Sequence, residues 1–378
     1  MRDNIIKTAC VIGLLTWSAG TFAEETSTSI IEVGEPAPQL MPQYGTTSSR
    51  ITFENQGQTL VGILTEPLMD SPYPIVVMAH GFSGNKDGLS VPVKGTEETM
   101  YGRTARVFAE QGIANLRFDY RGSGESDGDF ADMRFTRQIS DALVAIEYAA
   151  NLPQIDPERM GLLGLSQGGV IAPSAAARDD RIDSMVLWSP VAIPYATYTM
   201  DVLGPDTIET ELDLEGAGLT FVEAGLNLDD GESLSFTFSG RTLELKRPFF
   251  EELLKVDPVA EIVRFTKPLM VVVGLQDVGI KPQPQMGEIY MRYHEGEEAL
   301  IILDAGHVFN MLEGPEELDK AIAWSTDWFT KTLIEEEHHE ESEGFEGFER
   351  FFDRFGFDLR GFCERHPKGP FCESLFAN

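Results

Sequence analysis

Basic residues are scarce in this chain. Its 378 residues include 29 lysines and arginines against 62 aspartates and glutamates, which gives a formal net charge of −33 at neutral pH. A surface of this charge repels nucleic-acid phosphates and anionic lipid headgroups, so neither nucleic acid nor an anionic membrane is expected as a partner. Two explanations of the acidity stay open: solubility or tolerance of salt, and attraction of a cationic substrate or partner.

Long apolar segments are also lacking. An apolar run at residues 9–17 follows Arg2 and Lys7 and precedes small residues and the sequence Thr21-Phe22-Ala23. This arrangement is typical of a signal peptide, and we expect cleavage after Ala23, so that residues 1–23 direct export to the periplasm or the medium. The run is too short to persist as a stable membrane span.

Cysteine occurs at three positions, and Cys10 lies within the expected signal peptide. The other two, Cys363 and Cys372, are nine positions apart in a chain that we expect to be exported. Oxidising conditions outside the cytoplasm favour a small disulfide loop between them, with two free thiols as the alternative. Histidine is scarce as well, with six in the chain, which narrows the search for a catalytic base.

The middle of the chain alternates between candidate strands and candidate helices. Residues 24–49 are rich in Pro, Thr and Ser without apolar periodicity, and we expect a linker or a surface strap there. The alternation then predicts an α/β domain with a mostly parallel, doubly wound sheet over residues 50–193 and 258–334. The expected strands are residues 50–54, 59–65, 73–79, 113–119, 160–165, 184–188, 268–273 and 299–303, and the expected helices are 104–111, 139–151, 168–177, 287–293 and 316–333.

The alternation is interrupted at residues 194–257. Ten acidic residues and no lysine or arginine lie between Asp201 and Gly240. The segment is too long for a plain loop, so it is either an inserted cap between the sixth and seventh strands or a disordered insertion. Its apolar residues favour an ordered cap; they include Phe221, Leu226, Phe236 and Phe238.

Residues 335–378 form a tail of different composition. It opens with an acidic run that contains His338 and His339, and phenylalanine then recurs with glycine and charged residues from Phe345 to Phe362. Adjacent histidines among glutamates are more often solvated than bound to a metal, and solvation is our expectation here. The Phe-rich part is expected to pack as a short amphipathic helix on the domain or on a protein partner.

The sequence Gly164-Leu165-Ser166-Gln167-Gly168 has the pattern G-x-S-x-G, which is weak evidence on its own. Its context strengthens it, because an apolar strand is expected just before it and a helix of small residues just after it. Such a strand-to-helix turn lifts a serine above the sheet, and side chains at either glycine would collide with neighbouring backbone. The pattern predicts Ser166 as a nucleophile, with an ordinary glycine-rich turn as the alternative.

A serine hydroxyl needs a base within hydrogen-bond reach. His307 follows the last expected strand through a three-residue turn, and we expect it to be that base. His294 ends a predicted surface helix and is expected to be solvated. Asp277 follows the preceding strand, 30 residues before His307, and is expected to orient the histidine; Asp304 is its competitor.

Two backbone N–H groups are needed to stabilise the negative oxygen that forms when a serine attacks a carbonyl. We expect one from Gln167, directly after the candidate nucleophile. The other is expected from Phe82, in the sequence His80-Gly81-Phe82 that follows an apolar strand. His80 is expected to support this loop through its own hydrogen bonds.

Together these motifs resemble those of bacterial cinnamoyl and feruloyl esterases, which are serine hydrolases of the α/β-hydrolase superfamily and similar to dienelactone hydrolases. The resemblance covers residues 50–333 and rests on HGFSGNK at 80–86, FDYRGSGESDG at 118–128, and residues 164–169, 274–277 and 305–307. It implies the α/β-hydrolase fold and hydrolysis of small-molecule carboxylic esters through an acyl-enzyme. It also implies an insertion that forms part of the acyl pocket, and neither metal nor organic cofactor.

The acidic insertion and the tail depart from that family, and they leave the substrate open. Three hypotheses follow. The first is a carboxylesterase that acts on aryl or short-chain acyl esters. The second is an exported serine peptidase or a dienelactone-type hydrolase on the same fold. The third is a non-catalytic binding protein that uses the insertion and the tail to hold a partner.

Overall fold

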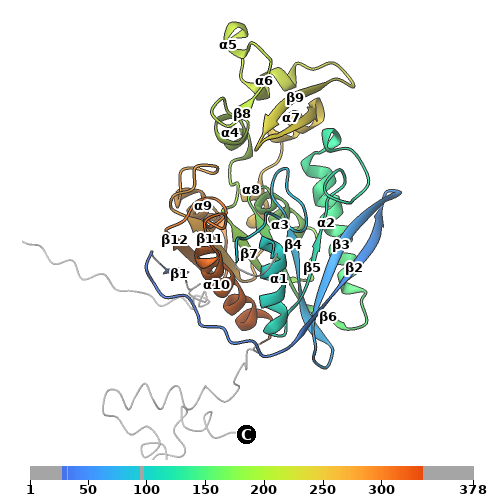
Figure 1. The fold of residues 1–378 in the computed structure, drawn as a ribbon, viewed down its shortest axis with the longest axis vertical. Helices are drawn as coiled ribbons and strands as arrows, with labels where there is room; N and C mark the ends of the chain where they lie inside the picture. The colour runs from blue at the N-terminus through green and yellow to red at the C-terminus, as the bar shows by residue number, and fades with distance from the viewer. Residues whose placement is uncertain (1–27, 32, 94–97, 335–378) are drawn as a thin grey trace, which may run out of the picture.

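The computed structural model describes residues 28–31, 33–93 and 98–334 (Figure 1). The expected signal peptide, the tail with His338 and His339, and the pair Cys363 and Cys372 lie outside the described residues. Predictions about export, a disulfide and a role of the tail therefore stay predictions.

A nine-stranded sheet forms the centre of the molecule, in the order β1-β12-β11-β7-β6-β4-β5-β3-β2. All neighbouring strands are parallel except at one end, where β2 pairs antiparallel with β3 and β3 with β5. The predicted mostly parallel, doubly wound sheet is thus confirmed. The strands are β1 (Thr28–Ile31), β2 (Thr46–Asn55), β3 (Gln58–Pro67), β4 (Tyr73–Ala79), β5 (Ala114–Phe118), β6 (Ile155–Leu165), β7 (Ile182–Trp188), β11 (Leu269–Gly274) and β12 (Glu298–Leu303).

Helices cover both faces of this sheet. Alternate residues of β4 show why: Ile75 and Val77 belong to one buried apolar cluster, and Val76 and Met78 to another on the opposite face. One face packs against α1 (Met100–Glu110) and α10 (Glu316–Leu333). The other packs against α2 (Phe135–Ala150), α3 (Gly168–Ala176), α8 (Pro258–Ile262) and α9 (Gln285–Tyr293); a 3-10 turn, η1 (Phe130–Asp132), precedes α2.

The N-terminal part of the chain differs from its expected role as a linker or strap. Thr28–Ile31 forms β1, which pairs parallel with β12 at the edge of the sheet. The strand pair expected from residue 50 begins earlier, because β2 pairs with β3 from Thr46 onward. No local apolar pattern marks β1, since an edge strand takes its order from backbone hydrogen bonds to a neighbour that is distant in sequence.

Residues 194–257 are ordered into short helices and a three-stranded antiparallel sheet, β10-β9-β8, which lies above the carboxyl ends of the central strands (Figure 1). The insertion falls between β7 and β11, which are the sixth and seventh strands when β1 is left out. Its elements are α4 (Pro194–Thr197), the π-helical turn η2 (Tyr198–Val202), β8 (Ile208–Glu209), α5 (Leu214–Ala217), α6 (Phe221–Leu226), β9 (Ser233–Phe238), β10 (Arg241–Lys246) and α7 (Arg247–Leu253).

Candidate active site

Ser166 lies on the sharp turn between β6 and α3. Its backbone has φ of 57°, in the left-handed region that few residues other than glycine adopt. Its N–H donates to the carbonyl of Trp188 on β7 (2.9 Å), and its own carbonyl accepts from the N–H of Gly169 (2.9 Å). These backbone hydrogen bonds hold the strained turn in place. Strained backbone conformations of this kind are concentrated at functional sites.

The two glycines that flank this turn are required by close backbone approach. A Cβ atom at Gly164 would lie 2.3 Å from the carbonyl oxygen of Gly168 in α3. A Cβ atom at Gly168 would lie 2.1 Å from the carbonyl oxygen of Ala79 at the end of β4. Both contacts are far below the van der Waals limit, so the expected collision of side chains at these positions is confirmed.

His307 and Asp277 are joined directly. The Nδ1 atom of His307 lies 2.8 Å from Oδ2 of Asp277, whose side chain is fully buried. The loops that carry them lie together because the N–H of Gln276 donates to the carbonyl of Ala305 (2.8 Å). Asp304, the competing carboxylate, instead accepts a hydrogen bond from the Gln276 side chain (3.1 Å). The histidine is thus paired with Asp277 rather than Asp304.

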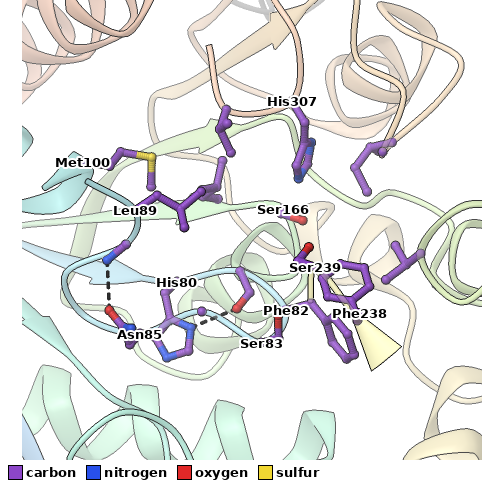
Figure 2. A pocket seen from close by; sticks show the side chains of 18 of the residues that line it. His80, Phe82, Ser83, Asn85, Leu89, Met100, Ser166, Phe238, Ser239 and His307 are labelled. Atoms are coloured by element: carbon purple, nitrogen blue, oxygen red, sulfur yellow. Dashed lines mark hydrogen bonds between the residues drawn. The ribbon is translucent and has the colours of Figure 1, made fainter. Parts of the chain in front are cut away.

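Ser166 and His307 line the same cavity, of about 640 Å³. Figure 2 shows the His307 ring on one side of the cavity, pointing toward Ser166. No hydrogen bond joins the two side chains among the described residues, and such bonds are often longer before a substrate is bound. Much of the lining is apolar and includes Leu89, Met100, Val202, Phe238, Ile280, Val308, Met311 and Leu312.

The backbone N–H groups of Phe82 and Gln167 are available to a ligand. Neither donates a hydrogen bond to any group in the described part of the chain. Gly81 and Phe82 line the cavity together with Ser166, and Gln167 directly follows Ser166 as the residue that precedes α3. Two unpaired donors beside a serine are the arrangement that an oxyanion requires.

The two sequence motifs at 80–86 and 118–128 are held together by an ion pair and a hydrogen bond. Lys86 is buried, and its Nζ lies 2.9 Å from Oδ2 of Asp119 and 2.7 Å from Oε2 of Glu125. His80 accepts a hydrogen bond at Nε2 from the N–H of Tyr120 (3.5 Å), and its Nδ1 lies 2.9 Å from the carbonyl of Gly81. The expected support of this loop by His80 is therefore found, together with an ion pair that motif reading did not anticipate.

His294 does not have the solvated position expected for it. Its side chain is fully buried, with Nε2 3.0 Å from the carbonyl of Lys267 and Nδ1 3.3 Å from Oε2 of Glu298. Burial lowers the pKa of His294. The sequence placed it correctly at the end of a helix, but the strand that follows folds back and covers that end.

Comparison with known proteins agrees with this architecture. A family model described as "Serine aminopeptidase, S33" (Hydrolase_4) matches residues 84–204. An uncharacterised 31.7 kDa protein of Escherichia coli from the traX-finO intergenic region is 29% identical over 276 residues, covering 69% of this chain and 92% of that protein. The esterase EstD of Thermotoga maritima is 27% identical over 283 residues, covering 72% of this chain and 64% of that protein.

Among solved structures, Est1E of Butyrivibrio proteoclasticus with bound ferulic acid superposes with a TM-score of 0.58 at 23% identity, covering 75% of this chain and 99% of that one. At this identity the likeness shows the fold. The chain has the α/β-hydrolase fold. Its similarity to hydrolases and esterases supports a hydrolase.

Three contacts within this α/β-hydrolase fold were not found by sequence reasoning. The Tyr198 hydroxyl donates to Oε1 of Gln167, the Gln167 amide donates to Oε1 of Gln138, and Arg241 donates to the carbonyl and hydroxyl of Ser83. Tyr198 and Arg241 belong to the insertion, where no motif marks them. Each contact joins segments at least 29 residues apart, so local patterns hold no signal for them.

Within the described residues of this hydrolase, no group of three or more His, Cys, Asp or Glu side chains is placed to hold a metal ion. None of the described helices is long and apolar enough to cross a bilayer.

Proposed function

We propose that this protein is an exported serine hydrolase that cleaves carboxylic esters through an acyl-enzyme on Ser166. The observation that carries the proposal is the placement of Ser166 and His307 on one cavity, with Asp277 bound to His307 and with the N–H groups of Phe82 and Gln167 unpaired within the described residues. The similarity to esterases supports the same reaction class.

In the proposed reaction, the Ser166 oxygen attacks the ester carbonyl carbon while His307 takes the hydroxyl proton. Asp277 holds the ring through Nδ1, which leaves Nε2 to face the serine and stabilises the charged ring. The negative oxygen of the tetrahedral intermediate accepts hydrogen bonds from the N–H groups of Phe82 and Gln167.

The intermediate then collapses, and His307 returns the proton to the departing alcohol. Water attacks the acyl carbon in the second half of the reaction, His307 removes its proton, and the acid leaves as Ser166 regains its hydrogen. Both halves use the same three side chains and the same pair of backbone donors.

The apolar lining of the cavity favours an aryl or short-chain apolar acyl group. Side chains from both the central domain and the insertion contribute, including Met100 from α1 and Phe238 from β9. Ester substrates with such acyl groups bury apolar surface when they bind, which favours binding by about 25 cal/mol per Å².

A second candidate, an exported serine peptidase, is favoured by the family model that matches residues 84–204. The two reactions share a nucleophile and differ in the leaving group, an alcohol or an amine. A side-by-side assay of p-nitrophenyl esters and aminoacyl p-nitroanilides separates them. If the protein is an esterase, it should turn over the esters faster than the anilides.

The decisive experiment compares the wild-type chain from residue 24 with Ser166→Ala, and uses Ser239→Ala as a matched control because Ser239 also lines the cavity. We expect turnover of p-nitrophenyl acetate or butyrate by the wild type and by Ser239→Ala, and a loss of about 1000-fold or more in Ser166→Ala. A fluorophosphonate should label only the two proteins that retain Ser166. Absence of both turnover and labelling in the wild type would favour the non-catalytic binding protein instead.

Export is the part of the proposal that rests on residues 1–23 alone. Expression of the full chain in a bacterial host should yield protein outside the cytoplasm whose N-terminal residue is Glu24, as read by mass spectrometry. A full-length cytoplasmic product would contradict export without bearing on the ester hydrolysis.

A further inference from the structure

We propose that the insertion positions both oxyanion donors, through Tyr198 for both and through Arg241 in addition for the loop of Phe82. The inference deepens the proposed ester hydrolysis and rests on it. It follows from contacts between the insertion and the side chains of Gln167 and Phe82, the two residues whose backbone N–H groups donate no hydrogen bond within the described residues.

Tyr198, in the insertion, contacts the side chain of Gln167. It opens the π-helical turn η2 (Tyr198–Val202), and it is fully buried. Its hydroxyl donates to Oε1 of Gln167, and burial raises the pKa of this hydroxyl well above its usual range, so it stays protonated and remains a donor. π-helical turns occur often at functional sites, because the extra residue redirects side chains.

Gln167 is held at both ends of its amide. While Oε1 accepts from Tyr198, the amide nitrogen donates to Oε1 of Gln138 on α2. The side chain is almost entirely buried, so an amide that lost one partner would leave a polar atom without compensation. The chain Tyr198–Gln167–Gln138 therefore fixes the side chain of the residue whose N–H is one expected oxyanion donor.

The same tyrosine also contacts Phe82. The rings of Phe82 and Tyr198 meet edge to face, with centroids 5.6 Å apart. Phe82 packs in the same way against Phe238 on β9, at 5.4 Å. The tyrosine ring is itself fixed by Phe249 of α7 and Phe135 of α2, at 5.4 and 5.9 Å. One insertion residue thus touches both donor-bearing residues.

A second contact holds the loop of Phe82 from the insertion. Arg241, at the start of β10, donates to the carbonyl and the hydroxyl of Ser83, the latter at 3.0 Å. Ser83 follows Phe82 and has φ of 53°, a conformation that needs outside support. Because the backbone at residues 82–83 carries the second oxyanion donor, the Arg241 contact limits where that N–H points.

The physical consequence concerns the rate of the chemical step. Donors stabilise an oxyanion only where they are already oriented, since reorientation during the reaction costs much of the gain. An insertion that merely covers the substrate would change KM, whereas an insertion that positions the donors changes kcat. Tyr198 is therefore a positioning residue that acts through Gln167 and Phe82.

The test compares Tyr198→Phe with Tyr195→Phe on p-nitrophenyl esters. Tyr195 lies three residues earlier in the same insertion with its side chain partly exposed, and forms a matched control. We expect Tyr198→Phe to lower kcat about 10- to 100-fold with KM within about twofold, less than the 100- to 1000-fold loss typical of a deleted donor. Affinity for an aryl trifluoromethyl ketone, whose adduct with Ser166 carries an oxyanion, should fall in parallel.

A double-mutant cycle distinguishes positioning from a general structural effect. In a Gln167→Leu background, which has no acceptor for the tyrosine hydroxyl, Tyr198→Phe should cause little further loss of kcat. Additive losses, a kcat of Tyr198→Phe within twofold of wild type, or an equal loss in Tyr195→Phe would each overturn the proposal.

Arg241→Gln tests the second contact independently of the buried tyrosine, so the proposal remains open to refutation even if Tyr198→Phe fails to fold. Arg241 is exposed, and we expect a several-fold lower kcat, with Arg247→Gln on α7 as a control that keeps the wild-type kcat. Unchanged kcat in Arg241→Gln together with unfolded Tyr198→Phe would overturn the proposal. Failure of the wild type to hydrolyse any ester or to be labelled would instead refute the ester hydrolysis on which the inference rests.

Discussion

The Nδ1 atom of His307 lies 2.8 Å from Oδ2 of Asp277, and the second carboxylate oxygen of Asp277 accepts hydrogen bonds from the N–H groups of Gly279 and Ile280 at 2.7 and 2.8 Å. The carboxylate is thus oriented by the backbone and in turn orients the ring. In the proposed reaction, this contact at Nδ1 leaves Nε2 to face Ser166, and the proposal therefore predicts an effect on kcat.

Asp277→Asn is expected to lower kcat by about 10,000-fold, because an amide that donates to Nδ1 favours the wrong tautomer and offers no charge to stabilise the protonated ring. Steady-state hydrolysis of a p-nitrophenyl ester measures the loss. Asp304→Asn is the control, since Asp304 contacts Gln276 and not the histidine. Equal effects of the two substitutions would return Asp304 to consideration as the orienting acid.

Lys86→Met is expected to reduce the free energy of unfolding by about 3–5 kcal/mol, because it leaves the fully buried carboxylate of Asp119 without its cation. Urea denaturation followed by tryptophan fluorescence measures this loss. The control is Lys320→Met, which removes a partly exposed pair with Glu317 and should cost about 1 kcal/mol or less. Similar costs for both would show that the 80–86 and 118–128 motifs are not held together by this ion pair.

Acid should destabilise the protein in part through His80. Burial lowers the pKa of His80 in the folded state, and its two nitrogens are already matched to a donor and an acceptor as a neutral ring. Above the unfolded-state value of about 6.5 the ring is neutral in both states and its contribution to stability is complete. As the pH falls from about 6.5 toward the lower folded-state pKa, the unfolded chain binds the proton first, and stability falls by about 1.4 kcal/mol per pH unit for this group.

The comparison with His80→Gln isolates that contribution from those of other titrating groups, including His294, whose pKa is also lowered by burial. Free energies of unfolding at pH 7.5, 6.5 and 5.5 should show the advantage of the wild type over the variant shrinking as the pH falls. A constant difference across the three pH values would mean that His80 binds its proton equally well in both states.

Much of the fold was predictable because its elements depend on local patterns. The continuous apolar run of β4, the hairpin at Gln56 and Gly57, and the amphipathic α10 each occur where periodicity and turn residues place them. The element bounds were less accurate: β6 begins at Ile155 rather than residue 160, because Ile155 already pairs with Tyr73, and the regular pairing with β4 resumes at Met160 after the polar residues 156–159.

The candidate site was predictable to the extent that chemistry and backbone geometry leave few choices. The chain has few histidines that could act as a base. The glycines on either side of Ser166 indicate a close approach of backbone segments that only glycine permits. The prediction that His294 is solvated was wrong, because its environment does not depend on local pattern. Its burial depends on Lys267 and Glu298, which approach it only when the sheet has formed.

By itself the sequence determined the order of strands and helices, the strand-to-helix turn at Ser166 and the candidate base and acid, since each follows from periodicity, glycine geometry or the short supply of a residue type. Tertiary structure alone decided the pairing of β1 with β12, the ion pair of Lys86 with Asp119, and the hydrogen bond of Tyr198 to Gln167. These relationships join segments that are distant along the chain. Their energies come from burial and hydrogen bonding between surfaces that exist only once the sheet and the insertion are packed together.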